Sequence, residues 1–276
     1  MLLLEALLAG LFGLLIGSFL NVCIYRWPRG LSVVRPRSFC TGCEKPIAWY
    51  DNVPVASYLL LRGKCRHCRA PIAWRYPLVE VLTAAAFFWF VWRFGASVGA
   101  AKYCVFSAIL IALTFADLET RLLPDELTIG GALMGVVFAW FTPVVDSTVH
   151  LLALLAGFSA GQRTLSIAES LVAALVPAGI LWLTGYLFEK IRHREGLGFG
   201  DVKMMAMMGA FLGTRGALFA LVAGSLLGSI VGLAYIRITR KNASEYELPF
   251  GVFLGIGGML AITVGGPMVE WYAGKL

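Results

Sequence analysis

The sequence has little charge for its length. Only 14% of its 276 residues are Asp, Glu, Lys or Arg, whereas 59% are apolar and the mean hydropathy is +0.80. An average globular chain carries about 25% charged residues, because charge keeps its surface in contact with water. An ordinary soluble fold is therefore excluded, and we expect most of the exterior to face lipid.

Several familiar binding motifs are also missing. The chain has no Gly-x-Gly-x-x-Gly dinucleotide fingerprint, no phosphate-binding loop and no His-Glu-x-x-His zinc motif. Its glycine-rich run at residues 255–258 is typical of closely packed membrane helices. Any chemistry must therefore come from other residues.

The positive charge is concentrated in one segment. Residues 26–77 hold 10 of the 23 Lys and Arg residues against two acids, so this segment carries +8 and the remainder −1. The same segment contains four of the six cysteines. We predict a first membrane helix at 1–25, a basic cysteine-bearing insert at 26–77 and a membrane domain at 78–276.

Long apolar stretches follow one another along the chain. A membrane span needs about 20 mostly apolar residues, and candidates lie at 2–25, 78–94, 99–116, 127–145, 167–188, 202–213, 215–236 and 249–271. The first lacks a basic start and a small-residue cleavage site, which favours a retained helix over a signal peptide. The sequence thus predicts an all-α polytopic membrane protein with about eight transmembrane helices.

The Lys and Arg positions predict the orientation of these spans, because cytoplasmic loops are enriched in both residues. With eight spans and a cytoplasmic insert, 18 of the 23 basic residues fall on the cytoplasmic side. We therefore expect both termini outside. The apolar segment 151–161 is too short to cross, so we expect it to form an outer-face or re-entrant segment.

Two Cys-x-x-Cys pairs stand in the insert, separated by 21 residues: Cys40 with Cys43, and Cys65 with Cys68. Four thiolates at this spacing suit a closed tetrahedral zinc site. A domain of about 50 residues has little core, so metal binding would supply part of its folding free energy. Disulfides and unrelated free thiols are the alternatives, and a reducing cytoplasm disfavours the first.

A basic zinc-ribbon-like insert also raises the question of nucleic-acid binding. Its Lys and Arg residues are spread among aromatic residues, and no reader helix is recognisable. We therefore expect no nucleic-acid partner and interpret the charge mainly as a determinant of membrane topology.

Two aspartates occupy costly positions, because carboxylates are expensive in lipid. Asp117 ends the third predicted span, and Asp201 opens the sixth in Gly198-Phe-Gly200-Asp201. Both fall at the predicted cytoplasmic edge, so they can meet in space. Two carboxylates that share a proton can hydrolyse an amide, one taking a proton from water while the other protonates the carbonyl oxygen.

Each aspartate also has a purely structural interpretation. Asp117 can pair with Arg121 at i+4, and Asp201 can cap the helix that follows it. Asp125, directly after Pro124, is expected to begin and cap a helix. The supporting residues around the pair are Gly198, Gly200, Asp125 and Lys203.

These motifs together resemble the bifunctional prepilin peptidases and N-methyltransferases, a family of membrane aspartic proteases with a Gly-x-Gly-Asp motif. The resemblance runs nearly end to end. It rests on the cysteine pairs and on the segments 17–21, 25–28, 51–54, 61–65, 75–80, 117–125, 198–201 and 249–251.

The resemblance implies a bacterial inner-membrane enzyme. Its substrates would be type IV prepilins and type II secretion pseudopilins, cut after the glycine that ends a short basic leader. Asp117 and Asp201 would be the catalytic pair, and the four cysteines would hold structural zinc. S-adenosylmethionine would then methylate the new N-terminal residue, for which Asn21, Tyr76 and Glu80 are candidates.

The sequence departs from the family pattern in two places: Thr41 and Val252 stand where proline is expected. Residues 146–166 also look like an insertion. Two alternatives stay open, another Gly-x-Gly-Asp intramembrane protease and a non-enzymatic zinc-ribbon adaptor. The first would favour Tyr before the first catalytic Asp, but Ala116 stands there.

Overall fold

The chain is helical and divides into two compact units. The computed structural model describes residues 1–144, 148–149, 153, 155, 161–193, 197–239 and 248–265. Unit 1 comprises Met1–Ala112 and unit 2 comprises Leu113–Leu276. The all-α expectation is confirmed for the described residues, and each unit is described by itself.

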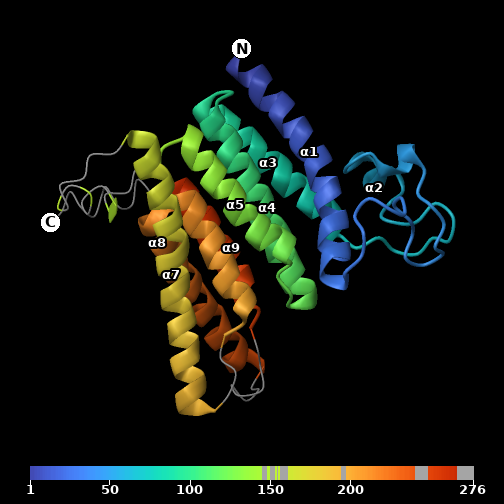
Figure 1. Ribbon diagram of the computed structural model, residues 1–276. Helices are drawn as coiled ribbons and strands as arrows, with labels where there is room; N and C mark the ends of the chain where they lie inside the picture. Colours follow the sequence, from blue (N-terminus) through green and yellow to red (C-terminus); the bar gives the residue numbers. More distant parts are fainter. Residues whose placement is uncertain are drawn as a thin grey trace. The chain divides into compact units, whose positions relative to one another are not determined.

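In unit 1, helix α1 (Leu2–Arg26) lies along helix α3 (Arg75–Phe94) (Figure 1). Glycines on α1 allow this close approach. A Cβ on Gly13 would lie 2.8 Å from Ala84 Cα, and one on Gly17 would lie 2.7 Å from Glu80 Cα. Small residues at such interfaces let helices pack by van der Waals contact, because lipid provides no hydrophobic driving force between them.

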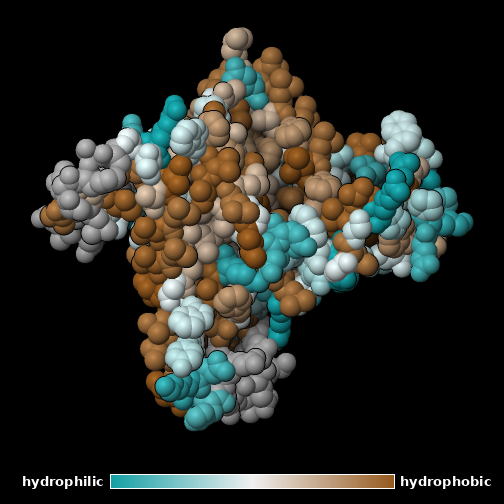
Figure 2. Space-filling view, viewed as in Figure 1, coloured by the Kyte–Doolittle hydropathy of each residue, from teal (hydrophilic) through white to brown (hydrophobic). Residues whose placement is uncertain are grey.

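The basic insert connects these two helices and contains only short elements: η1 (Trp27–Arg29), η2 (Trp49–Asn52) and α2 (Ala56–Leu60). Helix α3 begins at Arg75, three residues earlier than predicted. The sequence analysis ended the insert at Pro77 and began the helix after it, but proline is tolerated in the first turn of a helix. Figure 2 shows hydrophilic side chains gathered on the insert and hydrophobic ones along the helices.

Unit 2 begins within α4 (Val98–Thr120) and continues with α5 (Asp125–Phe141), α7 (Gln162–Arg192), α8 (Phe199–Thr239) and α9 (Phe250–Leu260). A short helix, η3 (Ala261–Gly265), follows α9. Helix α8 packs against α5, α7 and α9. The start of α8 therefore lies near the end of α4 and the starts of α5 and α9.

Among the residues that the structure describes, five helices are long and apolar enough to cross a membrane: α1 with η1, α3, α4, α7 and α8. The predicted spans 202–213 and 215–236 join into α8, which is interrupted at Gly213 with φ 79° and ψ 174°. This glycine stands where the sequence placed the boundary. The number of eight crossings stays a prediction, and the segment 151–161 lies almost wholly outside the described residues.

The contact between α7 and α8 provides a test of the packing. A Cβ on Gly209 would lie 1.8 Å from the Ala173 carbonyl oxygen, whereas one on Gly130 of α5 meets nothing within 4 Å. We expect Gly209→Ala to lower the free energy of unfolding by about 1–3 kcal/mol through overpacking. The matched control Gly130→Ala should be neutral or stabilising, because alanine favours helix by up to about 1 kcal/mol.

Thermal unfolding of both variants in the same detergent measures the difference. A Gly209→Ala protein that melts at or above the temperature of the Gly130→Ala protein would contradict this packing.

Candidate active site and metal centre

Asp117 lies in the last turn of α4 and is 5% exposed. Its carboxylate Oδ2 accepts the backbone N–H of Val252 at 3.0 Å, and the backbone of Gly251 also hydrogen-bonds to it. Both residues belong to the first turn of α9, whose backbone N–H groups have no partners within the helix. The N-terminus of α9 therefore binds the Asp117 side chain in the way helix N-termini bind anions.

Asp201 is the third residue of α8 and is 8% exposed. Its carboxylate hydrogen-bonds to the backbone of Gly198, the residue before the helix. This is the reciprocal position of a capping box, in which an acid at the third helical position reaches back to the residue that precedes the helix. The predicted capping role thus has a basis in the structure, with the side chain directed backwards.

The structure brings the two aspartates together. The charge of Asp117 acts on Asp201, although the residues are 84 positions apart. Leu123 lies between the glycines of the two helix starts: a Cβ on Gly200 would lie 3.1 Å from its Cβ, and one on Gly251 would lie 3.3 Å from its Cδ1. The pair therefore sits where α4 ends and α8 and α9 begin.

Asp117 has other partners besides Arg121, the residue that the sequence suggested for an ion pair. The Arg121 charge acts on Asp117, but the carboxylate is also held by the first turn of α9. A Cβ on Gly251 would lie 2.9 Å from Asp117 Oδ2. Only a residue without a side chain leaves this carboxylate in place.

Asp125 does not cap α5, as the sequence predicted, but pairs with Lys203. Asp125 begins α5, as expected, but Pro124 is the N-cap residue and no side chain caps that end. Asp125 instead forms an ion pair with Lys203 Nζ. This pair ties the start of α5 to the first turns of α8, next to Asp201.

Sequence reasoning missed the contribution of α9 to this site. Residues 249–251 entered only as a marker of family resemblance, without a role. The available signal was Pro249 followed by Phe250 and Gly251: proline cannot continue a preceding helix, and it suits the start of the next one. The sequence alone does not predict that the start of this helix faces Asp117.

The four insert cysteines form a second candidate site. The Sγ atoms of Cys40, Cys43, Cys65 and Cys68 all lie within 4.8 Å of one another, and those of Cys40 and Cys68 are 3.7 Å apart. Zinc–sulfur bonds of about 2.3 Å in a tetrahedron imply sulfur atoms about 3.8 Å apart. The geometry therefore fits a zinc ion held by all four residues.

The two cysteine turns repeat each other at an interval of 25 residues, a feature that sequence reasoning did not exploit. Cys40-x-x-Cys43-x-x-Pro46-Ile-Ala-Trp49 returns as Cys65-x-x-Cys68-x-x-Pro71-Ile-Ala-Trp74. Each turn closes with an antiparallel bridge, Phe39 to Pro46 and Lys64 to Pro71. Glu44 and Arg69, which follow the second cysteines, have φ of 57° and 60°. The cysteine cluster is thus built from two copies of one turn.

Electrostatics within the second turn favour a thiolate at Cys65. Hydrogen bonds from the backbone of Cys68 and of His67 lower the pKa of Cys65 to about 6. The backbone of Ala70 hydrogen-bonds to Cys68, the other cysteine of this turn, but burial and the neighbouring sulfurs raise the pKa of Cys68 to about 11. Zinc binds the thiolate and not the thiol, so Cys65 is the ligand of this turn nearer to its metal-binding form.

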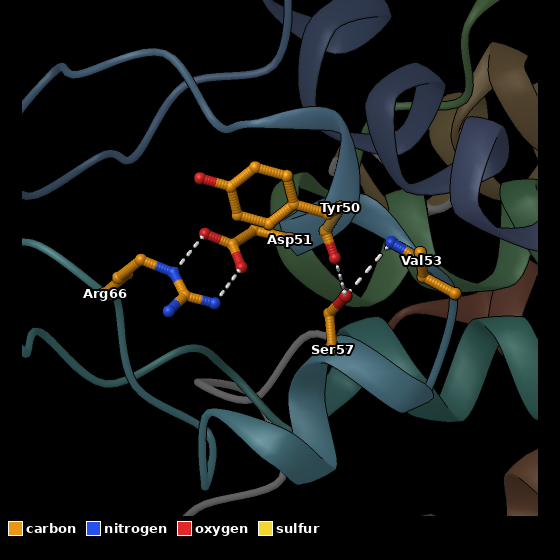
Figure 3. A network of polar contacts seen from close by, with 5 residues as sticks. All are labelled: Tyr50, Asp51, Val53, Ser57 and Arg66. Carbon is orange, nitrogen blue, oxygen red and sulfur yellow. Dashed lines mark hydrogen bonds and ion pairs between the residues drawn. The ribbon is translucent and has the colours of Figure 1, made fainter.

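An ion pair connects the second turn to the rest of the insert (Figure 3). Arg66 donates from Nε and from Nη2 to the two carboxylate oxygens of Asp51, at 2.7 and 2.6 Å. The Arg66 guanidinium therefore lowers the pKa of Asp51. This two-bond geometry fixes direction as well as distance, so it holds the turn against η2.

The methyl-transfer candidates lie together in unit 1. Asn21 Nδ2 donates to the Tyr76 carbonyl oxygen at 3.0 Å, and Glu80 follows one turn later in α3. Glu80 is 7% exposed, and its Oε2 accepts the backbone N–H of Val55 at 2.7 Å. The contact of Tyr76 with Asn21 is made by its backbone carbonyl and not by its side chain.

Comparison with known proteins covers both units. Residues 11–94 match the bacterial peptidase A24 N-terminal domain, and residues 104–233 match the type IV leader peptidase family. No solved structure matches the chain significantly.

Several curated relatives share the name prepilin leader peptidase/N-methyltransferase. The proteins of Aeromonas hydrophila and Pseudomonas putida are each 34% identical to this chain, with 95% and 94% of it and 91% and 90% of their own lengths aligned. The Neisseria gonorrhoeae protein is 31% identical over 96% of this chain and 93% of its own length. The chain therefore belongs to the type IV leader peptidase family.

Proposed function

We propose that this membrane protein removes the short basic leader from type IV prepilins and type II secretion pseudopilins, and then methylates the new N-terminal amine. The observation that carries this proposal is the buried pair Asp117 and Asp201 at the meeting point of three helix ends. This pair lies in the part of the chain that matches the leader peptidase family. The names of the relatives support the same two activities.

Peptide cleavage follows from the different surroundings of the two aspartates. Asp117 accepts N–H groups from the first turn of α9, and a carboxylate accepts such bonds best as an anion. We therefore assign to Asp117 the removal of a proton from the attacking water, and to Asp201 the donation of a proton to the scissile carbonyl oxygen. Collapse of the hydrated intermediate then breaks the C–N bond. The leaving amine takes the proton that Asp117 removed from the water, and Asp201 recovers its proton from a hydroxyl of the intermediate.

Glycines around the pair leave room for the substrate. Gly198 and Gly200 flank Phe199 just before Asp201, so two of the three residues that lead into the aspartate carry no side chain that would keep an extended peptide from the backbone. The ion pair of Asp125 with Lys203 supports this loop from the side of α5.

Methyl transfer is assigned to unit 1, since the peptidase pair occupies unit 2 and the N-terminal family model covers residues 11–94. S-adenosylmethionine supplies an electrophilic methyl group. The amine nitrogen forms the new C–N bond while the C–S bond breaks, S-adenosylhomocysteine leaves as a neutral thioether, and the amine releases its extra proton to water. We retain Asn21, Tyr76 and Glu80 as the residues that position this reaction.

The division into helix 1–25, insert 26–77 and membrane domain 78–276 is also part of the proposal, with the insert and the aspartate pair on the cytoplasmic side of the bacterial inner membrane. The 18 basic residues assigned to that side support this orientation. A leader kept in the cytoplasm would then present its cleavage site at the membrane surface.

Conversion of either aspartate to asparagine tests the peptidase. Asp117→Asn and Asp201→Asn should each lower leader cleavage by about 10³-fold, because each removes one partner of the acid–base pair. The double variant should be no worse than either single variant, since the two act as a unit. Purified enzyme with a short-leader prepilin, analysed by mass spectrometry, provides the measurement.

Glu126→Gln is the matched control, because Glu126 is an exposed acid in the first turn of α5. It should cleave at the wild-type rate. A folded Asp117→Asn, Asp201→Asn protein that still cleaves would sink the aspartyl mechanism, whereas a folded wild-type protein that does not cleave would favour the non-enzymatic adaptor.

A second test concerns the fit between Gly251 and Asp117. The methyl group of Gly251→Ala would displace Asp117 Oδ2, from which a Cβ would lie only 2.9 Å. Misplacing a reacting group by about 1 Å can cost about 100-fold, so we expect kcat to fall about 10- to 100-fold with KM nearly unchanged. Gly130→Ala, with open space around it, is the control, and equal kcat values for the two variants would contradict the arrangement.

The metal centre predicts one zinc ion per chain. Replacing Cys40 or Cys65 with serine should remove most of the bound zinc, whereas Cys23→Ala and Cys104→Ala should leave it unchanged, since these two cysteines are buried in the helices. Elemental analysis of the purified proteins measures the metal. Limited proteolysis should then show the insert opening on chelation, because metal binding is coupled to its folding. An insert that stays protease-resistant without zinc would show the metal to be dispensable.

A further inference from the structure

We propose that α2, with the apolar residues on either side of it, lies in the phospholipid headgroup region at the membrane surface where α1 ends and α3 begins. The inference rests on the proposed placement of α1 and α3 across the membrane and is independent of both enzymatic activities. It starts from a contrast in the sequence. Residues 52–61, Asn-Val-Pro-Val-Ala-Ser-Tyr-Leu-Leu-Leu, carry no charge, although they stand within the basic insert.

Burial in this uncharged run is the reverse of that in a soluble helix. The polar Ser57 is 6% exposed, and its Oγ donates to the Tyr50 carbonyl oxygen and accepts the Val53 N–H (Figure 3). Leu59 and Leu60 are instead 67% and 83% exposed. A helix in water directs its leucines inward, because burial of apolar surface stabilises the fold. Exposed leucines around a buried serine therefore indicate apolar surroundings.

Contacts with α1 and α3 place the run at the membrane boundary. The Val55 N–H donates to Glu80 Oε2 at 2.7 Å, and Glu80 also hydrogen-bonds to the Ser18 side chain. Glu80 stands five residues after Arg75, where α3 begins, and Ser18 eight residues before Arg26, where α1 ends. These separations correspond to about 8 Å and about 12 Å along the two helices. Val55 therefore lies deeper in the membrane than the two helix ends.

A cavity between α1 and the insert supports the same depth. Leu15 and Phe19 of α1 line it together with Asn52 and Pro54. The two α1 side chains belong to the apolar run of the first span and are exposed, so they face lipid. Figure 1 shows α2 beside α1 and not beyond its end. Lipid that covers this side of α1 therefore meets the segment that leads into α2.

Basic residues follow α2 directly and suit the phosphate layer. Arg62 and Lys64 are exposed, and residues 52–79 contain no acid. Anionic lipids attract Lys and Arg near the membrane surface, and an apolar stretch beside basic residues is typical of interfacial helices. Trp49 and Trp74, exposed at equivalent positions of the two cysteine turns, are of the residue type enriched at membrane interfaces. The partner that fits this surface is an anionic phospholipid layer.

Photo-cross-linking tests the contact directly. We expect p-benzoylphenylalanine in place of Leu60 to capture phospholipid when the full-length, zinc-loaded protein is illuminated in nanodiscs, with a mass increase of a single lipid. The same label in place of Leu11, an exposed residue of α1, is the positive control. In place of Glu44, an exposed acid beside the first cysteine turn, it is the negative control.

A lipid yield at position 60 close to that at position 11 is the expected result. A yield as low as that at position 44 would overturn the proposal. Capture of a second copy of the chain in place of lipid, in vesicles of higher protein density, would overturn it as well.

Amide hydrogen exchange tests the role of the leucines. The double variant Leu59→Ser, Leu60→Ser should exchange its α2 amides at least about tenfold faster, because loss of the apolar contacts releases α2 from the membrane surface. Leu31→Ser, at another exposed leucine of the insert, is the matched control and should leave these amides unchanged. Zinc content and thermal unfolding show that both proteins are folded. Equal exchange in the double variant and the wild type would contradict the proposal.

The basic residues predict a preference for anionic lipid. Discs that contain phosphatidylglycerol should protect the α2 amides more than discs of phosphatidylcholine alone, and the double variant Arg62→Gln, Lys64→Gln should lose this difference. Lys45→Gln, which removes a charge beside the first cysteine turn, should retain it. A difference that persists in the double variant, or that is absent from the wild type, would exclude the anionic headgroup as the partner.

Failure of the proposed function has a different signature. A protein that captures lipid at position 60 but cleaves no prepilin would refute only the proposed function. A protein that cleaves and methylates prepilin without a lipid adduct at this position would refute only the membrane contact of α2.

Discussion

The hydrogen bond from the Val252 N–H to Asp117 joins residues 135 positions apart, and the arrangement of the candidate active site depends on it. A carboxylate near the membrane must find donors within the protein, because it cannot rely on water. The first turn of α9 provides them, since helix N-termini have N–H groups without internal partners. The same bond that solvates Asp117 therefore also fixes the start of α9 against the end of α4, and Gly251 allows the approach.

Glycines, which have no side chain, allow the helices of both units to pack closely. In unit 1, Gly13 and Gly17 bring α1 onto α3, which sets the distance between Asn21 and the start of α3. In unit 2, Gly209 lets α8 lie against the α7 backbone, and Gly257 would place a Cβ 2.3 Å from the Ala220 carbonyl oxygen. These contacts position the functional side chains, although none of the glycines takes part in the chemistry.

Much of this was predictable from the sequence because the dominant constraints are local. Apolar runs of membrane length predicted the helices, and the interruption of α8 at Gly213 falls on the last residue of the predicted span 202–213. The cysteine spacing predicted that the four sulfur atoms meet. The first turn of α3 and the role of α9 were missed, because helix starts depend on single residues such as Pro77 and Pro249. The ion pair of Asp125 with Lys203 was missed for another reason: it joins two helices, and its partners are 78 positions apart.

The net charge of the insert does not show what its individual arginines do. As a total of +8 it was interpreted as a topological signal, and the enrichment of Lys and Arg in cytoplasmic loops supports that meaning. Individual arginines nevertheless have local partners. Arg26 donates to the Ser32 and Arg37 carbonyl oxygens. Arg66 pairs with Asp51, and Arg29 stacks on the Tyr25 ring at 4.3 Å.

The bond between Arg66 and Asp51 has a consequence of its own for the insert. Because Arg66 lowers the pKa of Asp51 in the folded state, the stabilisation is complete above the unfolded pKa of about 3.9 and is lost as the pH falls through the lower folded value. Arg66 is half exposed, so solvent screening keeps this contribution small at neutral pH. The pair therefore orients the second cysteine turn more than it stabilises it. A segment with so little core gains stability from its surroundings, and the helices α1 and α3 at its two ends hold it in place.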